Sequence, residues 1–229
     1  MTSPPGLFIT GTDTEVGKTH VTAMIARALV AAGRRVGVYK PAASGCREED
    51  GRLVADDAVA LWEAANRPAT LDQVCPQQFL APLAPHLAAR AEGREMDAEL
   101  LRRGIDFWTD RSDIVLVEGA GGLMSPMGDD EYVADLAYDF GFPLIVVSAN
   151  RLGTINQTLQ TLITAASFRD GLDVAGIVVN QPEPPTDDAS LTTNAAEIAA
   201  RAGCPLLAQV AWQQQEFLEP VDWYALAAD

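Results

Sequence analysis

The segment Gly11-Thr-Asp-Thr-Glu-Val-Gly-Lys-Thr19 decides the fold of this 229-residue chain. It follows a short apolar run at 7–10 and precedes an alanine-rich amphipathic stretch at 18–32, so the order is strand, glycine-bounded loop, helix. In that order, the backbone N–H groups of the loop and the helix N-terminus converge on phosphate oxygens. We expect Lys18 to reach the β and γ phosphates and the Thr19 hydroxyl to bind Mg²⁺. The segment therefore indicates a nucleoside triphosphate site, with an ordinary strand-to-helix turn as the alternative.

The chain contains two lysines, Lys18 and Lys40, among 16 basic residues. Lysine is a compact point charge and arginine a planar fork, so the two are not interchangeable at a tight phosphate site. Pro41 disfavours helical geometry at Lys40 and predicts that this lysine is extended at the end of the apolar run 35–39. We expect its ammonium to point into the crevice beside the phosphate loop. A solvated surface lysine is the alternative.

Alternating apolar and amphipathic segments predict one α/β domain spanning residues 1–229. Strands are expected at 7–10, 35–39, 114–118, 143–148, 174–179 and 205–210. Helices are expected at 18–32, 56–65, 97–109, 154–168 and 190–202. Several strands are continuously apolar, as in a parallel sheet covered on both faces. We predict a doubly wound, mostly parallel sheet of six to seven strands flanked by helices; the proline-rich stretch 66–96 is expected to form loops, with room for one short strand.

The formal net charge of −16 excludes nucleic acid and anionic membrane surfaces as expected partners. No apolar run approaches membrane-spanning length, and the chain enters its first strand too early for a signal peptide. The three cysteines lack the spacing of metal ligands, and we interpret them as reduced thiols of a cytoplasmic protein: Cys46, Cys75 and Cys204.

Polar residues follow other predicted strands, where the ligand sites of such sheets gather. Glu118 ends an apolar strand before a glycine-rich run, and a carboxylate there is suited to Mg²⁺. Asn180 ends the strand at 174–179, and its amide could read a purine edge or form a turn. Asp56 and Asp57 precede an apolar periodic segment, where a helix N-cap is the simpler interpretation for one of them.

Together these motifs resemble the dethiobiotin synthetase family, whose fold is of the P-loop NTPase type. The resemblance rests on Gly11 to Thr19 with its five-residue gap, Tyr39-Lys-Pro41, Ser44-Gly45, Asp57-Ala58, Pro85-His86, Val117-Glu-Gly-Ala-Gly-Gly122 and Leu152-Gly-Thr-Ile-Asn156. It implies a ligase that uses ATP and Mg²⁺ to insert CO₂ between the two amines of 7,8-diaminononanoate, giving dethiobiotin, ADP and phosphate. A carbamate and a carbamic–phosphoric anhydride would be the intermediates.

The resemblance also implies a role for each matching residue, with Lys40 as the catalytic lysine. The metal ligands would be Thr19, Asp57 and Glu118. The nucleotide would be bound by Glu15, Val16, Gly17, Lys18, Thr19, His20, Asp57, Glu118, Gly119, Ala120, Gly121, Asn180, Gln181, Ala211, Trp212 and Gln213. The diamine would be bound by Thr14 and Ser44, and by a loop from the partner subunit of a homodimer comprising Arg151, Gly153, Thr154, Ile155 and Asn156.

The sequence departs from the family pattern at Ala84, Gln181 and Ala211. Either Glu216 or Glu219 could supply the acidic ribose contact. Two other classes use similar loops. An ATPase switch of the partitioning type would need a second lysine early in the loop and a basic or amphipathic surface. A cobyrinate-type amidotransferase synthetase would carry a glutaminase domain, for which we expect no room in this chain.

Overall fold

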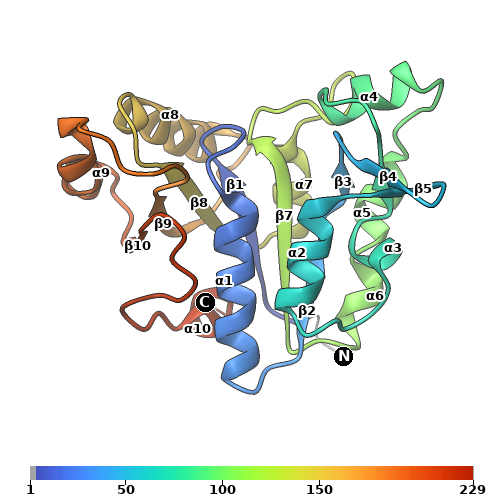
Figure 1. Ribbon diagram of the computed structural model, residues 1–229, viewed down its shortest axis with the longest axis horizontal. Helices are drawn as coiled ribbons and strands as arrows, with labels where there is room; N and C mark the ends of the chain where they lie inside the picture. The colour runs from blue at the N-terminus through green and yellow to red at the C-terminus, as the bar shows by residue number, and fades with distance from the viewer. Residues whose placement is uncertain (1–3, 229) are drawn as a thin grey trace.

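The computed structural model describes residues 4–228, and a six-stranded sheet forms its centre (Figure 1). The strands lie in the order β10-β9-β8-β1-β7-β2, and every pairing among them is parallel. Their bounds are β1 Gly6–Gly11, β2 Val36–Tyr39, β7 Ile114–Gly122, β8 Leu144–Ala149, β9 Val174–Asn180 and β10 Leu206–Val210. The predicted fold is confirmed, and β7 extends beyond the expected 114–118. Met1 to Ser3 and Asp229 lie outside the described residues. The expectation that the chain carries no signal peptide concerns that N-terminal segment.

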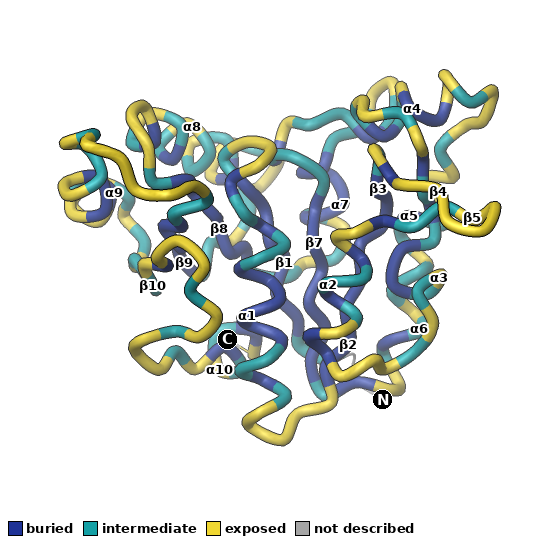
Figure 2. The backbone as a smooth tube through the Cα atoms, viewed as in Figure 1, coloured by how far each residue is buried: buried dark blue, intermediate teal, exposed yellow. Residues whose placement is uncertain are grey.

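Helices cover both faces of the sheet. In Figure 1, α1 (Lys18–Ala31) and α2 (Asp56–Ala64) lie in front of it, and α7 (Val133–Phe140) lies behind β7. Figure 2 shows the central strands as buried, and every residue of β1, β2 and β8 is buried. Burial on both faces explains why these strands are continuously apolar rather than alternating.

Strand β1 lies inside the sheet, between β8 and β7. From β1 the chain crosses to the edge strand β2, returns through β7, and then passes β1 to reach β8, β9 and β10. The direction of winding therefore reverses beside β1. Ligands of doubly wound sheets bind at the carboxyl ends of the strands at such a reversal. The glycine-bounded loop 12–17 follows β1 at this place.

The predicted helix at 97–109 is wrong because two shorter helices occupy the segment, α5 (Ala98–Arg103) and α6 (Asp106–Thr109). The hydroxyl of Tyr39 donates hydrogen bonds to the carbonyls of Leu100 and Leu101, at 2.9 and 3.0 Å. A side chain at Gly104 would place its Cβ 2.3 Å from the same hydroxyl. The Tyr39 hydroxyl therefore binds the carbonyls of Leu100 and Leu101 and fills the space beside Gly104, where the two helices meet.

The stretch 66–96 is also more regular than predicted. It contains α3 (Leu71–Val74), α4 (Pro85–Ala91) and the short strand β6 (Gln77–Gln78), which pairs with β3 (Ala42–Ala43). Gln73 accepts a hydrogen bond from the Thr70 backbone N–H at 3.1 Å, and Pro85 begins α4. Both are helix-start signals that the proline content of the segment obscured.

The remaining elements complete the two ends of the sheet. The predicted helix at 154–168 is confirmed as α8 (Thr154–Ser167), whereas 190–202 comprises a 3₁₀ turn, η1 (Ala189–Thr192), and α9 (Asn194–Arg201). A hairpin of β4 (Arg47–Glu49) and β5 (Arg52–Val54) precedes α2, and α10 (Trp223–Ala228) ends the described chain.

No helix among residues 4–228 is long and apolar enough to cross a membrane. The three cysteines form no disulfide in the described chain. Burial raises the pKa of each of their thiols, which keeps them protonated and unreactive.

Candidate active site

The loop between β1 and α1 has the geometry of a phosphate cradle. Glu15 and Gly17 both have positive φ, 56° and 90°, which turns successive backbone N–H groups toward one concavity. A Cβ at Gly17 would lie 2.1 Å from the amide nitrogen of Asn180, so this position requires glycine. Helix α1 begins at Lys18, directly after the loop, and its N-terminus adds partial positive charge.

Lys18 is buried inside this loop. Its Nζ donates a hydrogen bond to the backbone carbonyl of Asp13 at 3.0 Å. Burial, the largest cause, lowers the pKa of Lys18; the carboxylate of Glu118 opposes the shift, and the positive charge of Lys40 adds to it. The two lysines of the chain therefore lie near each other, as the sequence predicted.

Lys40 lies between two carboxylates at the end of β2. Its Nζ is 2.6 Å from Glu118 Oε1 and 2.7 Å from Asp57 Oδ2, and its side chain is 4% exposed. The alternative of a solvated surface lysine is therefore wrong. Burial lowers the pKa of Lys40, but Glu118 and Asp57 outweigh burial and raise it overall. The two carboxylates therefore hold Lys40 as a cation within this cluster.

Glu118 joins the two lysine environments to the phosphate loop. It lies in β7, is fully buried, and accepts a hydrogen bond from the Thr19 hydroxyl at 2.8 Å. Its second oxygen, Oε2, has no hydrogen-bond partner within residues 4–228. An orphaned carboxylate oxygen in a buried cluster is unfavourable unless a ligand completes it. Asp57 is the second residue of α2, and neither it nor Asp56 caps that helix by a side-chain hydrogen bond. The N-cap interpretation of this pair is therefore wrong.

The glycine run after Glu118 packs against the phosphate loop. Gly122 pairs with Gly11 after a register shift in the β1–β7 pairing, and its N–H donates to the Ser125 hydroxyl at 2.9 Å. A Cβ at Gly121, where φ is 71°, would lie 2.3 Å from that hydroxyl and 3.7 Å from the Thr14 methyl carbon. Of the predicted positions, Gly121 thus lies beside Thr14, whereas Gly119 faces Val133 and Phe8 in the core.

Asn180 ends β9 behind the phosphate loop and is 2% exposed. Its Nδ2 donates to the Val16 carbonyl at 2.9 Å, which fixes the orientation of the amide. Its Oδ1 has no partner within residues 4–228. A neighbouring cavity of about 480 Å³ is lined in part by Gln181, Ala211 and Trp212. The predicted base-side residues are therefore gathered beside a buried, unsatisfied acceptor.

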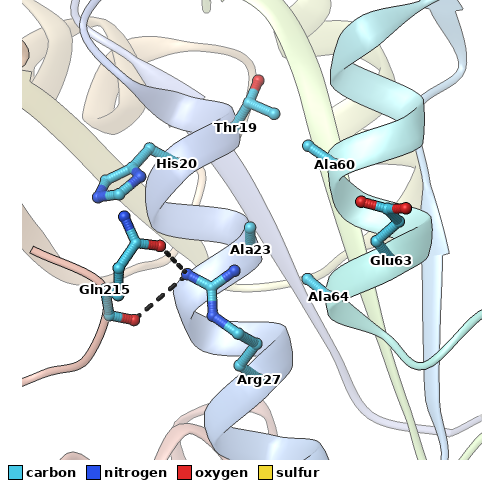
Figure 3. A pocket seen from close by; sticks show the side chains of 8 residues that line it. All are labelled: Thr19, His20, Ala23, Arg27, Ala60, Glu63, Ala64 and Gln215. Carbon is cyan, nitrogen blue, oxygen red and sulfur yellow. Dashed lines mark hydrogen bonds between the residues drawn. The ribbon is translucent and has the colours of Figure 1, made fainter. Parts of the chain in front are cut away.

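A second cavity, of about 570 Å³, lies between α1 and α2 (Figure 3). His20 and Arg27 reach from α1 to the segment 211–217, where the imidazole Nε2–H donates to the Gln214 carbonyl at 2.7 Å. Arg27 donates to the carbonyl and side-chain oxygens of Gln215 at 3.2 and 3.3 Å. Sequence reasoning missed Arg27 and placed His20 at the triphosphate. Only their spacing of seven residues, which puts both on one face of a helix, could have linked them.

The residues predicted for the diamine lie on two sides of β1, because Ser44 follows β2 and β3 whereas the segment 151–156 follows β8. Ser44 follows β3 and is partly buried, whereas Arg151, Gly153 and Asn156 are exposed. Thr154 instead points into the core, where its hydroxyl hydrogen-bonds to that of Ser148 at 2.5 Å. A cavity of about 480 Å³ lies beside this region. It is lined by Thr12, Asp13, the segment 122–126, Gln157, Gln160, Thr161 and Thr164. This polar stripe on α8 was not predicted from the sequence, although its spacing of three and four residues is visible there.

Comparison with known proteins shows the family to which the chain belongs. A family model described as an AAA domain matches residues 5–216. A protein of Rhodopirellula baltica named ATP-dependent dethiobiotin synthetase BioD is 42% identical over 214 residues, which cover 89% of this chain and 82% of that protein. A protein of the same name from Anaeromyxobacter dehalogenans (strain 2CP-C) is 44% identical, and the match covers 91% of this chain and 90% of that protein. The chain belongs to the ATP-dependent dethiobiotin synthetase family.

Solved structures agree on the fold of this family member. A ParA family ATPase of Chlorobium tepidum superposes with a TM-score of 0.55 at 15% identity, covering 92% of this chain and 84% of that chain. An FtsY signal recognition particle receptor of Elizabethkingia anophelis gives a TM-score of 0.54 at 13% identity, with 100% of this chain matched to 65% of that chain. At such low identities the likeness concerns the fold alone, so the ParA match does not favour the partitioning-ATPase alternative.

Proposed function

We propose that this chain catalyses the reaction for which its family is named, the ATP-dependent closure of dethiobiotin from 7,8-diaminononanoate and CO₂. One amine captures CO₂ as a carbamate, and a carbamate oxygen attacks the γ-phosphorus of ATP, releasing ADP. The second amine then displaces phosphate from the mixed anhydride and closes the cyclic urea. The observation that supports the proposal most strongly is that Glu118 contacts both Lys40 and the phosphate loop. Its carboxylate lies 2.6 Å from Lys40 Nζ and accepts a hydrogen bond from the Thr19 hydroxyl at 2.8 Å.

Phosphoryl transfer requires mainly positioning and neutralisation of charge, and the chain supplies both. Lys18 and the N–H groups of the loop from Glu15 to His20 would hold the triphosphate. Lys40, whose raised pKa keeps it charged, would neutralise the carbamate and the oxygens of the transferred phosphoryl group. Glycines 119 and 121, with Ala120 between them, would let the backbone approach the phosphates closely.

The chemistry of the donor set fits Mg²⁺ bound together with ATP. The described residues form no group of three or more His, Cys, Asp or Glu side chains able to hold a metal. Mg²⁺ usually takes one or two carboxylates and completes its shell with phosphates and water. Glu118, with its orphaned Oε2, Asp57 and the Thr19 hydroxyl would be these ligands. Held there, the ion would help to neutralise the negative charge of the phosphates.

Asn180 supports ATP as the nucleotide. One N–H of its Nδ2 donates to Val16, and the amide would present its unpartnered acceptor, Oδ1, to the base. An acceptor there favours an exocyclic amino group, such as that of adenine, over a carbonyl oxygen. Gln181, Ala211, Trp212 and Gln213 would line the rest of the base site, and Glu216 or Glu219 would face the ribose.

We also propose that the diamine pocket is completed by a second copy of the chain. Thr14 and Ser44 would bind the amines or the carbamate, while Arg151 and the residues Gly153 to Asn156 of the partner subunit would hold the distal carboxylate. Within one chain Arg151 and Asn156 are exposed, as a contribution to a partner requires. The homodimer would act as a cytoplasmic enzyme of residues 1–229, one domain per chain.

The reaction is tested by incubating the protein with diaminononanoate, bicarbonate, Mg²⁺ and one nucleoside triphosphate, with mass detection of dethiobiotin. ATP and inosine triphosphate form a matched pair because they exchange the 6-amino group for a 6-oxo group. We expect at least a tenfold higher kcat/KM with ATP. Arg52→Gln, in the exposed β4–β5 hairpin, should leave the rate unchanged and is the control substitution. Absence of product with every nucleotide would refute the proposed function.

A further inference from the structure

A cavity of about 300 Å³ lies at the end of the sheet opposite the phosphate loop. It is formed where α1 ends, β2 begins and the turn from α6 to β7 passes beneath them, at the lower end of the molecule in Figure 1. Its first β2 residue is Val36, whereas Lys40 follows the last residue of that strand. With about 3.3 Å per strand residue, the two positions are roughly 13 Å apart. This cavity is therefore separate from the candidate active site.

Three arginines line this cavity: Arg34, Arg35 and Arg111. Such a concentration is unexpected in a chain with 32 acidic and 16 basic residues. Arg35 is paired with Asp113, with its Nη2 2.6 Å from Oδ1. Among residues 4–228, Arg34 and Arg111 form no ion pair, although most other arginines do.

Aromatic rings hold these two arginines in place. The Arg34 guanidinium lies 3.9 Å from the ring centroid of Tyr224, and that of Arg111 lies 4.4 Å from the ring centroid of Phe107. Arg111 also donates one N–H to the Phe107 carbonyl at 2.9 Å. Stacking fixes the planar fork but leaves N–H donors available at its edge. The two guanidiniums are therefore pre-oriented cations without an ion-pair partner within the described chain, although the charge of Arg34 helps to lower the pKa of nearby Asp113.

The base of the cavity adds buried polar groups. Ser112 is 8% exposed and Trp108 is 1% exposed, and both line the cavity. The Trp108 indole N–H is buried and has no hydrogen-bond partner within the described chain. Gly37 makes room for this pair on β2, since a Cβ there would lie 2.5 Å from the Ser112 hydroxyl and 3.1 Å from a Trp108 ring carbon. The indole N–H is itself enclosed, so Trp108 contributes ring surface to the cavity and Ser112 is the polar side chain at its base.

We propose that this cavity binds a phosphate group, either as inorganic phosphate or on a small phosphorylated molecule. Arg34 and Arg111 supply charge-assisted hydrogen bonds of the bidentate kind that suit phosphate oxygens, and Ser112 adds a hydroxyl donor. Arg35 contributes positive charge, partly offset by Asp113. The cavity also has room for a small organic group beside the phosphate. The proposal rests on these contacts alone and is independent of the reaction assigned to the active site.

The test is a ¹H–¹⁵N TROSY titration of the full-length protein with inorganic phosphate and, separately, with glycerol 3-phosphate. Ionic strength is held constant because screening weakens charge interactions. We expect saturable shifts of the Ser112 amide and the Trp108 indole, with Gly17 reporting any binding at the phosphate loop. Tighter binding of one probe identifies the source of the phosphate group, and equal binding shows that the group alone is recognised. No shift at Ser112 or Trp108 with either probe overturns the proposal.

Two variants separate local binding from an effect transmitted from the phosphate loop. Arg34→Gln with Arg111→Gln should weaken the response at Ser112 at least tenfold while leaving the response at Gly17 intact. The single Arg111→Gln variant, which retains the Arg34–Tyr224 stacking, serves if the double variant unfolds, and Arg52→Gln is the matched control. Lys18→Gln should abolish the response at Gly17 only. A Ser112 response that survives loss of the arginines and disappears in Lys18→Gln would refute the site.

Discussion

The two lysines differ in what surrounds their charges. Lys18 has a backbone carbonyl for a partner, and burial lowers its pKa. Lys40 has two carboxylates, which raise its pKa. A cation held without a carboxylate at contact distance is suited to binding a polyanion in ground and transition states alike. A cation balanced between carboxylates is suited to a charge that develops during the reaction.

Lysine substitutions should therefore separate binding from turnover. Lys18→Gln is expected to weaken ATP binding and lower kcat together, because its charge faces the β and γ phosphates throughout. Lys40→Gln is expected to lower kcat at least a hundredfold and to raise the KM for diamine, with the Kd for ATP within about threefold. Calorimetry and steady-state rates give these values. If the rate of product formation by Lys40→Gln stayed within about threefold of the wild-type rate, the activation barrier would have risen by less than ~1 kcal/mol. That result would contradict the catalytic role of Lys40.

Asp57 should make stability depend on pH. Burial raises its pKa, but Lys40 outweighs burial and lowers the pKa below the ordinary value of 3.8. A depressed carboxyl pKa adds stability that is fully present above pH 3.8 and is lost as pH falls through the folded-state pKa. In urea unfolding without nucleotide, Asp57→Asn should therefore narrow the gap in unfolding free energy between pH 5 and pH 3. The effect should be about 1 kcal/mol or less, since the side chain is half exposed. Asp187→Asn, a substitution in an exposed loop, is the control and should leave the difference in unfolding free energy between pH 5 and pH 3 unchanged. The same difference in the wild type and in both variants would show that Asp57 does not link stability to pH.

Some site residues could be predicted from the residues next to them in the sequence, and others could not. The extended Lys40 could be predicted because Pro41 follows it, and Lys18 because its motif is contiguous. The contact between Lys40 and Glu118 joins residues 78 positions apart, and that between Thr19 and Glu118 joins residues 99 apart. Strand order alone brings these side chains together, so a sequence pattern could place them at one edge of the sheet but could not pair them.

Among the elements, the strands were the more predictable. Strands β1, β2 and β8 are buried along their whole length, and this burial on both faces gives each of them a continuous apolar signal that does not depend on its neighbours. The break between α5 and α6 depends instead on Tyr39, which is 61 residues from Leu100. No local property of 97–109 predicts that its carbonyls would be taken by a distant hydroxyl. Helix α7 was missed although Gly141 ends it in the left-handed conformation, a signal that the sequence did contain.

Helix α1 also holds the base-side segment. His20 and Arg27 fix the backbone at Gln214 and Gln215, next to Trp212 and the strained Gln213, whose φ is 59°. One helix therefore carries the start of the phosphate cradle and the supports of the segment proposed to bind the base. The relative positions of phosphates and base would follow from this shared support.

Loss of these contacts should act on nucleotide affinity more than on turnover. Each hydrogen bond contributes about 0.5–1.5 kcal/mol net, so His20→Leu and Arg27→Gln are each expected to raise the KM for ATP by about two- to tenfold. The value of kcat should stay within about twofold, and the preference for ATP over inosine triphosphate should fall. Arg52→Gln controls for loss of a surface arginine. A lower kcat at unchanged KM would show that His20 and Arg27 do not position the base-side segment.

For the whole molecule, some of the exposed apolar side chains belong to the segments where a second copy is proposed to bind. Leu152 is 79% exposed, Ile163 on α8 is 67% exposed, and Met124 beside the α8 cavity is 48% exposed. Exposed apolar patches are often interaction sites. Leu152 belongs to the proposed substrate loop 151–156 and Ile163 to the helix α8 that begins within it, so dimer contact and completion of the diamine pocket would involve neighbouring segments.

Subunit mixing tests this arrangement. If each active site draws Lys40 from one chain and Asn156 from the other, homodimers of Lys40→Ala and of Asn156→Ala each have two defective sites. A mixed dimer carries both substitutions in one site and neither in the other. With random exchange, half of the dimers are mixed and half of their sites are intact, so activity should recover to about a quarter of wild type, as a two-fold isologous interface requires. The two variants are unfolded and refolded together, mixed dimers are confirmed by native mass spectrometry, and dethiobiotin formation is assayed. Confirmed mixed dimers without activity would mean that each chain builds its own pocket.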